Sequence, residues 1–186
     1  MSPSGPAGGA ATGPEDRRRR RVLWSMPTGL YLVGSRAGDK ANLMTANWVM
    51  QVATAPPLVA VSVEAGAVTR RLVAESGAFS VTILDRGQRG VVRSFVKPVG
   101  DVERDATGSI VAMAGIPVAE VGAGLPVGSG GIGWLACTVR REVELGSHVL
   151  FVGEVTAVGE GGDDGDGTGE PRAPLRMEDT RMHYGG

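Results

Sequence analysis

The sequence predicts a mainly β protein, a Greek-key-like barrel of six or seven strands with short helices over its open ends. From Leu30 onward, short β-prone runs alternate with glycine, proline and polar clusters, which is typical of an all-β barrel or sandwich. Glycine contributes 30 of the 186 residues, far above its usual share, and this excess indicates many tight turns. Two stretches instead carry apolar residues three or four positions apart, and this spacing predicts helices.

The individual elements follow from these runs. The helices are expected at 68–76 and at 88–95, where Pro98 stops the second one. The strands are expected at 30–34, 42–52, 58–63, 78–84, 132–143 and 148–158, with a short last one at 180–184. The chain length suits one compact domain, which we expect to occupy residues 25–186.

Charge and hydropathy exclude several function classes. The 19 basic and 20 acidic side chains nearly cancel, so no overall field favours nucleic acid or a membrane surface. No apolar run approaches the about 18–20 residues that span a bilayer, and the N-terminus lacks the apolar core of a secretory signal. We therefore expect a cytoplasmic protein with no membrane partner.

The N-terminal residues 1–24 are expected to form a disordered arm. A Gly/Pro/Ala/Ser tract precedes the run from Arg17 to Arg21, and neither can build a core. A basic arm can bind nucleic acid, but no aromatic residue is interleaved with these arginines for base stacking. The solvated reading is therefore favoured over nucleic-acid binding.

Three other features are read as structural. The acidic glycine-rich stretch at 159–173 lacks the terminal Glu and flanking helices of a calcium loop, so we interpret it as a surface loop. The G-x-G-x-x-G match from Gly128 to Gly133 precedes a strand, whereas a dinucleotide-binding motif opens a helix. The single cysteine, Cys137, lies in an apolar run and is expected to be buried and inert. No metal site is predicted.

The chemistry is concentrated between residues 42 and 69. Thr45 and Asn47 interrupt a β run, and burying them without hydrogen-bond partners would be costly, so they face a turn, a water or a polar ligand. The helix expected from residue 68 opens with Thr69 and Arg70, whose hydroxyl and cation could hold a phosphate at the free helix amides. The alternative is that Thr69 is only an N-cap or first-turn residue of the helix and that Arg70 lies on a solvated face.

The order of these residues resembles one family, the flavin reductase-like, FMN-binding split-barrel proteins. The similarity covers residues 27–158. Its carriers are Asn42-x-x-Thr45-Ala46-Asn47-Trp48-Val49, Pro56-Pro57-Leu58-Val59-Ala60-Val61-Ser62-Val63, Thr69 with Leu72-Val73, Ser76-Gly77-Ala78-Phe79-Ser80-Val81, Phe95, the strand around Cys137, and His148-Val149-Leu150-Phe151-Val152-Gly153-Glu154-Val155.

The resemblance implies a homodimer of six-stranded Greek-key split barrels, with FMN, or FAD, bound in a groove near the dimer interface. NADH or NADPH would be the electron donor, and His148 would lie near the flavin ring where nicotinamide stacks. Several residues would contact the flavin, largely through their backbones: Thr45, Ala46, Asn47 and Trp48 at the ribityl chain and ring edge, Val61, Ser62 and Val63 along the ribityl chain and phosphate, and Thr69 and Arg70 at the phosphate.

The implied activity is that of an NAD(P)H:flavin reductase, which passes hydride from a nicotinamide to FMN and can supply a flavin-dependent monooxygenase component. The resemblance leaves two other flavin-binding functions open: an electron-transfer protein that keeps its FMN, and a non-catalytic flavin-binding barrel. A third alternative, which does not bind flavin, is a β-barrel interaction module that uses the arginine arm. Tyr184 would either cover a flavin ring or plug the barrel.

Overall fold

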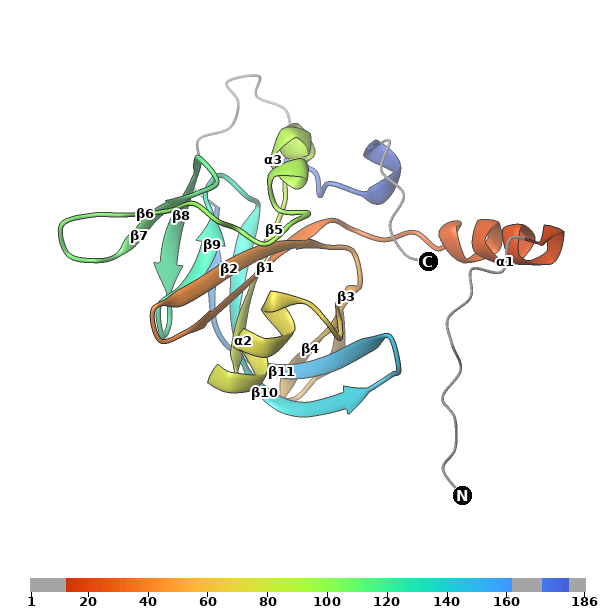
Figure 1. Ribbon diagram of the computed structural model, residues 1–186, viewed down its shortest axis with the longest axis horizontal. Coiled ribbons are helices and arrows are strands. Elements are labelled where there is room, and N and C mark those ends of the chain that lie inside the picture. Colours follow the sequence, from red (N-terminus) through yellow and green to blue (C-terminus); the bar gives the residue numbers. More distant parts are fainter. Residues whose placement is uncertain (1–12, 162–171, 181–186) are drawn as a thin grey trace.

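The computed structural model of the chain describes residues 13–161 and 172–180 and consists mainly of antiparallel strands (Figure 1). The helices are α1 (Pro14–Trp24), α2 (Val68–Ser76) and α3 (Arg89–Ser94), and short 3-10 turns cover Arg86–Gln88 and Met177–Asp179. The strands are β1 (Tyr31–Ala37), β2 (Lys40–Ala46), β3 (Val49–Thr54), β4 (Pro57–Glu64), β5 (Ala78–Ile83), β6 (Val102–Arg104), β7 (Ile110–Met113), β8 (Ile116–Val121), β9 (Leu125–Gly128), β10 (Gly133–Glu144) and β11 (His148–Glu160).

The main sheet has seven strands in the order β2-β1-β5-β10-β11-β4-β3. Its two edge strands, β2 and β3, are consecutive in the chain and are joined only by Asn47 and Trp48. Such a link spans at most about 10 Å when fully extended. The sheet must therefore curl until its edges meet, which closes it into a barrel whose seam lies at these two residues.

Two hydrophobic cores lie on the two faces of this curled sheet. Val33 belongs to the core inside the barrel, which α2 covers through Val73, whereas Leu32 belongs to the core between the barrel, the small sheet and α3. Successive strand residues point to opposite faces, so Leu32 and Val33 lie in different cores, and both are fully buried. Gly34 on the same strand is required, since an added Cβ would overlap the Pro126 carbonyl and the Ser80 hydroxyl.

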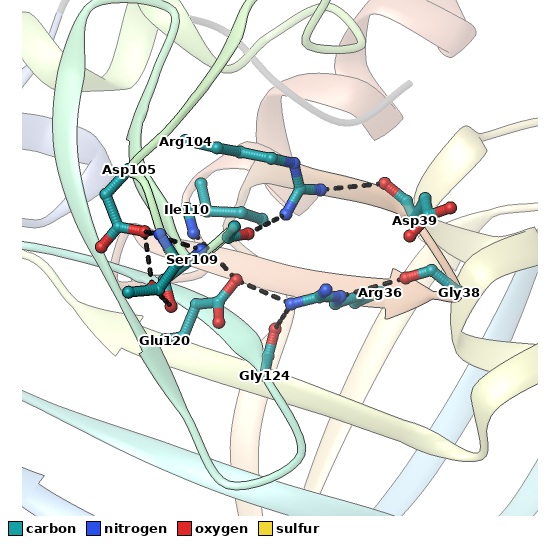
Figure 2. A network of polar contacts seen from close by, with 11 residues as sticks. Arg36, Gly38, Asp39, Arg104, Asp105, Ser109, Ile110, Glu120 and Gly124 are labelled. Atoms are coloured by element: carbon teal, nitrogen blue, oxygen red, sulfur yellow. Dashed lines mark hydrogen bonds and ion pairs between the residues drawn. The ribbon is translucent and has the colours of Figure 1, made fainter.

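The second sheet, in the order β6-β7-β8-β9, is held to the barrel by a polar network (Figure 2). The Arg36 Nη1 of β1 donates to Glu120 Oε1 of β8 at 2.7 Å, and the same oxygen accepts from the Ile110 backbone N–H at 3.0 Å. Arg104 of β6 donates from Nη2 to the Asp39 carbonyl at 3.0 Å. These contacts fix the small sheet to the β1–β2 hairpin.

The mainly β class and both predicted helices are confirmed. The G-x-G-x-x-G match precedes a strand as expected, and its residues 129–132 form the loop that joins β9 to β10. The single strand expected at 42–52 is wrong, because the chain breaks at the barrel seam to give β2 and β3. The four strands between residues 102 and 128 were not predicted. Three of them have only three or four residues, too few to show an alternating pattern.

The expectation of disorder over residues 1–24 is wrong for its second half, which forms α1 and projects from the barrel (Figure 1). Pro14 starts the helix, and Asp16 in its first turn pairs with Arg19 and Arg20 at 3.0 and 2.7 Å. An acidic first turn and pairs three or four residues apart both favour helix. Residues 1–12 lie outside the described part of the chain.

Two other expectations fall near undescribed segments. The acidic loop expected at 159–173 begins later than predicted, because β11 extends to Glu160, and residues 162–171 lie outside the described part. The short strand expected at 180–184 also lies outside it, except for Thr180. Within the described residues, no helix is long and apolar enough to cross a bilayer.

Candidate flavin site at the barrel seam

The centre of the candidate site is the seam where β2 passes into β3. The Ser62 backbone N–H of β4 donates to the Trp48 carbonyl at 3.0 Å, which fixes the crossing against the barrel. The Trp48 ring, 41% exposed, lies against the His148 ring with 4.8 Å between centroids and an interplanar angle of 59°. Two aromatic rings that the sequence separates by a hundred residues are thereby adjacent, and Asn47 lies half-buried beside them.

The pairing of β4 with β11 decides which side chains share this surface. Ser62 lies opposite Leu150, and Glu64 lies opposite His148. Directly opposed residues point to the same face of a sheet, so Ser62 and His148 share one face. Val61 and Val63 alternate to the other face and are fully buried in the barrel core, so only their backbones could approach a ligand.

Thr45 and Ala46, at the end of β2, are also buried, and Thr45 ties the seam to α3. The Thr45 Oγ1 donates to the Val92 carbonyl at 2.8 Å, and the Thr45 backbone N–H donates to the Phe95 carbonyl at 2.9 Å. These bonds satisfy the polar side chain that the sequence placed inside a β run. Thr45 therefore supports the site from behind.

A buried hydrogen-bond relay connects α2 to the same strand. The Asn42 Oδ1 accepts from the Val99 backbone N–H at 2.9 Å, and the Asn42 Nδ2 donates to Thr69 Oγ1 at 2.9 Å. Because a backbone N–H can only donate, Val99 fixes which end of the amide faces Thr69. Asn42 thus holds both α2 and the segment after α3 against β2.

This relay changes the expected role of Thr69. Its side chain is fully buried, and the N-cap position of α2 is occupied by Ala67, without a side-chain cap. Thr69 is therefore a first-turn residue, as the alternative interpretation allowed, and not the N-cap, and its hydroxyl anchors the helix. Asn42 was not singled out as a site residue, although a buried amide between Ala41 and Leu43 in a strand is a signal that could have found it.

Arg70 is placed where a cation is unfavourable without an anion. It lies in the first turn of α2, which contains no acidic residue, close to the positive end of the helix dipole. Its Nη2 pairs with Glu142 Oε1 of β10 at 3.1 Å, while its Nε is buried and has no hydrogen-bond partner. An orphaned guanidinium donor beside a helix N-terminus fits a phosphate group.

An apolar groove of about 370 Å³ lies at the open side of the barrel, beyond the seam. Its lining includes Tyr31, Met50, Leu58, Leu135 and Val158. Burial of the Tyr31 phenol raises its pKa above the ordinary value, so Tyr31 stays neutral at physiological pH. The groove offers no charge to a ligand and suits an apolar surface.

The thiol of Cys137 is a poor catalyst, and the described residues offer no metal site. Cys137 is 1% exposed in the barrel core, and burial raises the pKa of its thiol to about 12, so it is protonated at neutral pH. The expectation of a buried cysteine is thus confirmed. Among the described residues, no three His, Cys, Asp or Glu side chains are grouped closely enough to hold a metal ion.

Apart from the half-buried Asn47, the structure therefore divides the predicted site residues into two sets. Trp48, Ser62 and His148 share the outer surface at the seam, and Arg70 is tied to the same β10–β11 hairpin through Glu142. The other set is buried and can contribute only as backbone or support: Thr45, Ala46, Val61, Val63 and Thr69. Two adjacent aromatic rings at the seam and a cation at the start of α2 are the kinds of contact that a ligand with an aromatic head and an anionic tail needs.

A curled, split antiparallel barrel with such a surface defines a class of flavin-binding proteins, and the comparisons agree. Residues 23–186 match the flavin reductase like domain. This chain belongs to that family, and it is an oxidoreductase of the flavin reductase type.

Individual relatives show how close the similarity is. The NADH-dependent FAD reductase of Streptomyces globisporus is 32% identical over 146 residues, which cover 76% of this chain and 75% of that protein. The NADH-dependent flavin reductase of a Rhodococcus species is 32% identical over 139 residues, covering 73% and 72%. The solved structure of the Streptomyces globisporus C-1027 NADH:FAD oxidoreductase SgcE6 with NAD and FAD fragments covers 96% of this chain and 98% of its own, with a TM-score of 0.71 and 26% identity.

Some relatives contain more than the shared domain. The chain spans 46% of a probable flavin reductase of Rhizobium meliloti and 57% of the high molecular weight rubredoxin of Moorella thermoacetica, each at 27% identity. The flavin reductase domain is thus combined with additional chain in these proteins.

The Asn42 relay generates a stability prediction. Replacing Asn42 by Ala should lower the free energy of unfolding by about 2–4 kcal/mol, because the buried Thr69 hydroxyl loses its partner at a cost of about 1–3 kcal/mol and the part-buried Val99 N–H adds a cost at the lower end of that range. Denaturant unfolding followed by circular dichroism measures the loss. Gln51→Ala, which removes an exposed amide bonded to the Ala53 carbonyl, is the control and should cost less than about 0.5 kcal/mol. Equal stability of the two variants would show that the relay does not hold the structure.

Proposed function

We propose that the chain is an NAD(P)H:flavin reductase that binds FMN along the seam surface and passes hydride to it from a reduced nicotinamide. The observation that carries this proposal is the seam, where the Trp48 and His148 rings lie in tilted contact, together with Arg70 at the start of α2, whose buried Nε has no hydrogen-bond partner. A flavin with its phosphate tail has the same order of parts, an aromatic ring system followed by an anion.

The chain's own residues bind and orient the reactants in this proposal. A bound flavin supplies a ring nitrogen that accepts hydride from the nicotinamide C4. The backbones of residues 45–48 and 61–63 border the ring edge and ribityl chain, Ser62 offers a hydroxyl on the exposed face, and His148 borders the position of the nicotinamide. The closely packed barrel behind them excludes water from one side of the reacting atoms. No side chain needs to take up a proton for this step.

Names of relatives support the choice of cosubstrates and partner. Several are NADH-dependent flavin reductases, so NADH is the favoured donor, and FAD is an alternative to FMN because one relative reduces FAD. The styrene monooxygenase flavin reductase of Pseudomonas putida S12, 26% identical with a TM-score of 0.62, supports a flavin-dependent monooxygenase as the consumer of reduced flavin. A cytoplasmic location, where reduced nicotinamides are made, is part of the proposal.

A second candidate is an electron-transfer protein that keeps its flavin. The similarity to the high molecular weight rubredoxin of Moorella thermoacetica favours it, since a rubredoxin is itself a redox protein. The two candidates differ in flavin retention, because a reductase that feeds a separate monooxygenase must release its product.

The central test is spectroscopic. The purified protein should be yellow, or should quench added FMN fluorescence, and NADH added without oxygen should bleach the flavin band much faster than NADPH does. Dialysis then separates the two candidates, since a flavin-releasing reductase becomes colourless and an electron-transfer protein stays yellow. A protein that binds neither FMN nor FAD, or binds flavin that no nicotinamide reduces, would contradict the reductase proposal.

We further propose a homodimer that uses the open side of the barrel. Met50 and Val52 of β3 and Val158 of β11 are 64%, 46% and 66% exposed beside the apolar groove. Large apolar side chains that gather on one surface usually mark a contact with another protein. A second copy related by a two-fold axis would present the same groove and cover these side chains.

This dimer can be tested by one charge substitution. In sedimentation velocity at micromolar concentration, the wild-type chain should run as a dimer. Met50→Glu should shift it toward monomer, because a carboxylate would be buried in an apolar contact. Val111→Glu, at a position 41% exposed on the small sheet, is the matched control and should remain dimeric. A wild-type protein that sediments as a monomer would refute the proposed dimer.

The phosphate contact is tested by Arg70→Ala. Losing a charge-assisted contact of about 1.5–3 kcal/mol should weaken FMN binding by about ten- to a hundredfold, as measured by fluorescence titration. Riboflavin, which lacks the phosphate, should bind the variant and the wild type equally. Arg71→Ala removes the neighbouring exposed cation and should have little effect on either ligand. Equal weakening of FMN and riboflavin would move the phosphate site elsewhere.

A further inference from the structure

The ion pair between Arg70 and Glu142 is an incomplete contact for both partners. Only Arg70 Nη2 reaches Glu142 Oε1, at 3.1 Å, and the buried Nε of the same guanidinium has no acceptor. The two side chains are 29% and 35% exposed, which is the range where ion pairs contribute little to stability. A structural ion pair would use the guanidinium fork more fully. The contact is therefore weak and easily exchanged.

The position of Glu142 places this contact at the start of α2. Glu142 lies on β10 opposite Phe151 of β11, so its side chain points to the face of the hairpin that α2 covers, and His148, at the turn of the same hairpin, lies on the other face. Its carboxylate contacts Arg70 in the first turn of α2, which is 72 residues away in sequence. That turn contains no acidic residue of its own. It thus supplies the anion that this helix end lacks, in the place proposed for the flavin phosphate.

We propose that Glu142 is an internal competitor for Arg70, which the flavin phosphate must displace in order to bind. This inference rests on the proposed flavin site. The carboxylate neutralises Arg70 while the site holds no flavin, and the phosphate replaces this single contact by contacts with the accessible nitrogens of the guanidinium. Glu142 thereby lowers the affinity for phosphorylated flavin and favours the release of reduced FMN over its retention.

The test is the FMN affinity of Glu142→Gln, measured by fluorescence titration of the purified protein. Removing an exposed ion pair worth a fraction of a kcal/mol to about 1 kcal/mol should tighten FMN binding about two- to fivefold. Riboflavin binding should not change. Glu144→Gln, on the same exposed strand end, is the matched control for a long-range charge effect and should change FMN affinity less.

A double variant separates competition from other causes. Glu142→Gln should have no effect on FMN affinity when Arg70 is already Ala, because the competition needs the guanidinium. Suppose that Arg70→Ala weakens FMN binding but Glu142→Gln weakens FMN binding or leaves it unchanged. Glu142 is then no competitor, and the inference fails while the proposed phosphate site stands. If Arg70→Ala leaves FMN binding unchanged, the phosphate site and the inference both fail, whereas reduction of bound flavin by NADH would still uphold the reductase proposal.

Discussion

The two-residue link between β2 and β3 is the constraint on which the rest of the structure depends. A seven-stranded sheet whose edge strands are consecutive in sequence cannot stay open, because the link formed by Asn47 and Trp48 is too short to reach from one edge of an open sheet to the other. Closure brings the end of β2, one face of β4 and the start of β11 next to one another at the seam. The candidate site is therefore a direct product of barrel closure, and its backbone groups come from strand residues and from the two-residue link between β2 and β3.

The sequence predicted those elements whose signal is local. The apolar spacing of Leu72 and Val73 defined α2 at its observed bounds, and the apolar runs defined the strands of the main sheet. The break at Asn47 could not be read from the sequence, because it is imposed by closure and not by a glycine or proline. The α1 helix was missed because composition suggested a solvated arm, while its ion pairs to Asp16 favoured a helix.

The structure gives the residues predicted for the site unequal positions in the fold. Alternation along β4 separates Ser62 from Val61 and Val63, and this could have been read from the strand period. The burial of Thr69 and its bond to Asn42 depend on how α2 packs, and the pairing of Arg70 with Glu142 depends on a hairpin far along the chain. Such contacts arise from tertiary structure and leave no local pattern.

The insertion of the β10–β11 hairpin between β5 and β4 has a consequence for synthesis of the chain. Until residues 133–160 have left the ribosome, β2-β1-β5 and β4-β3 are separate ladders, and β5 and β4 each have a bare edge. Bare edges with apolar faces invite pairing with other chains. Nascent or prematurely terminated chains are therefore the form most exposed to aggregation and to chaperone capture, and the hairpin removes that hazard in a single step.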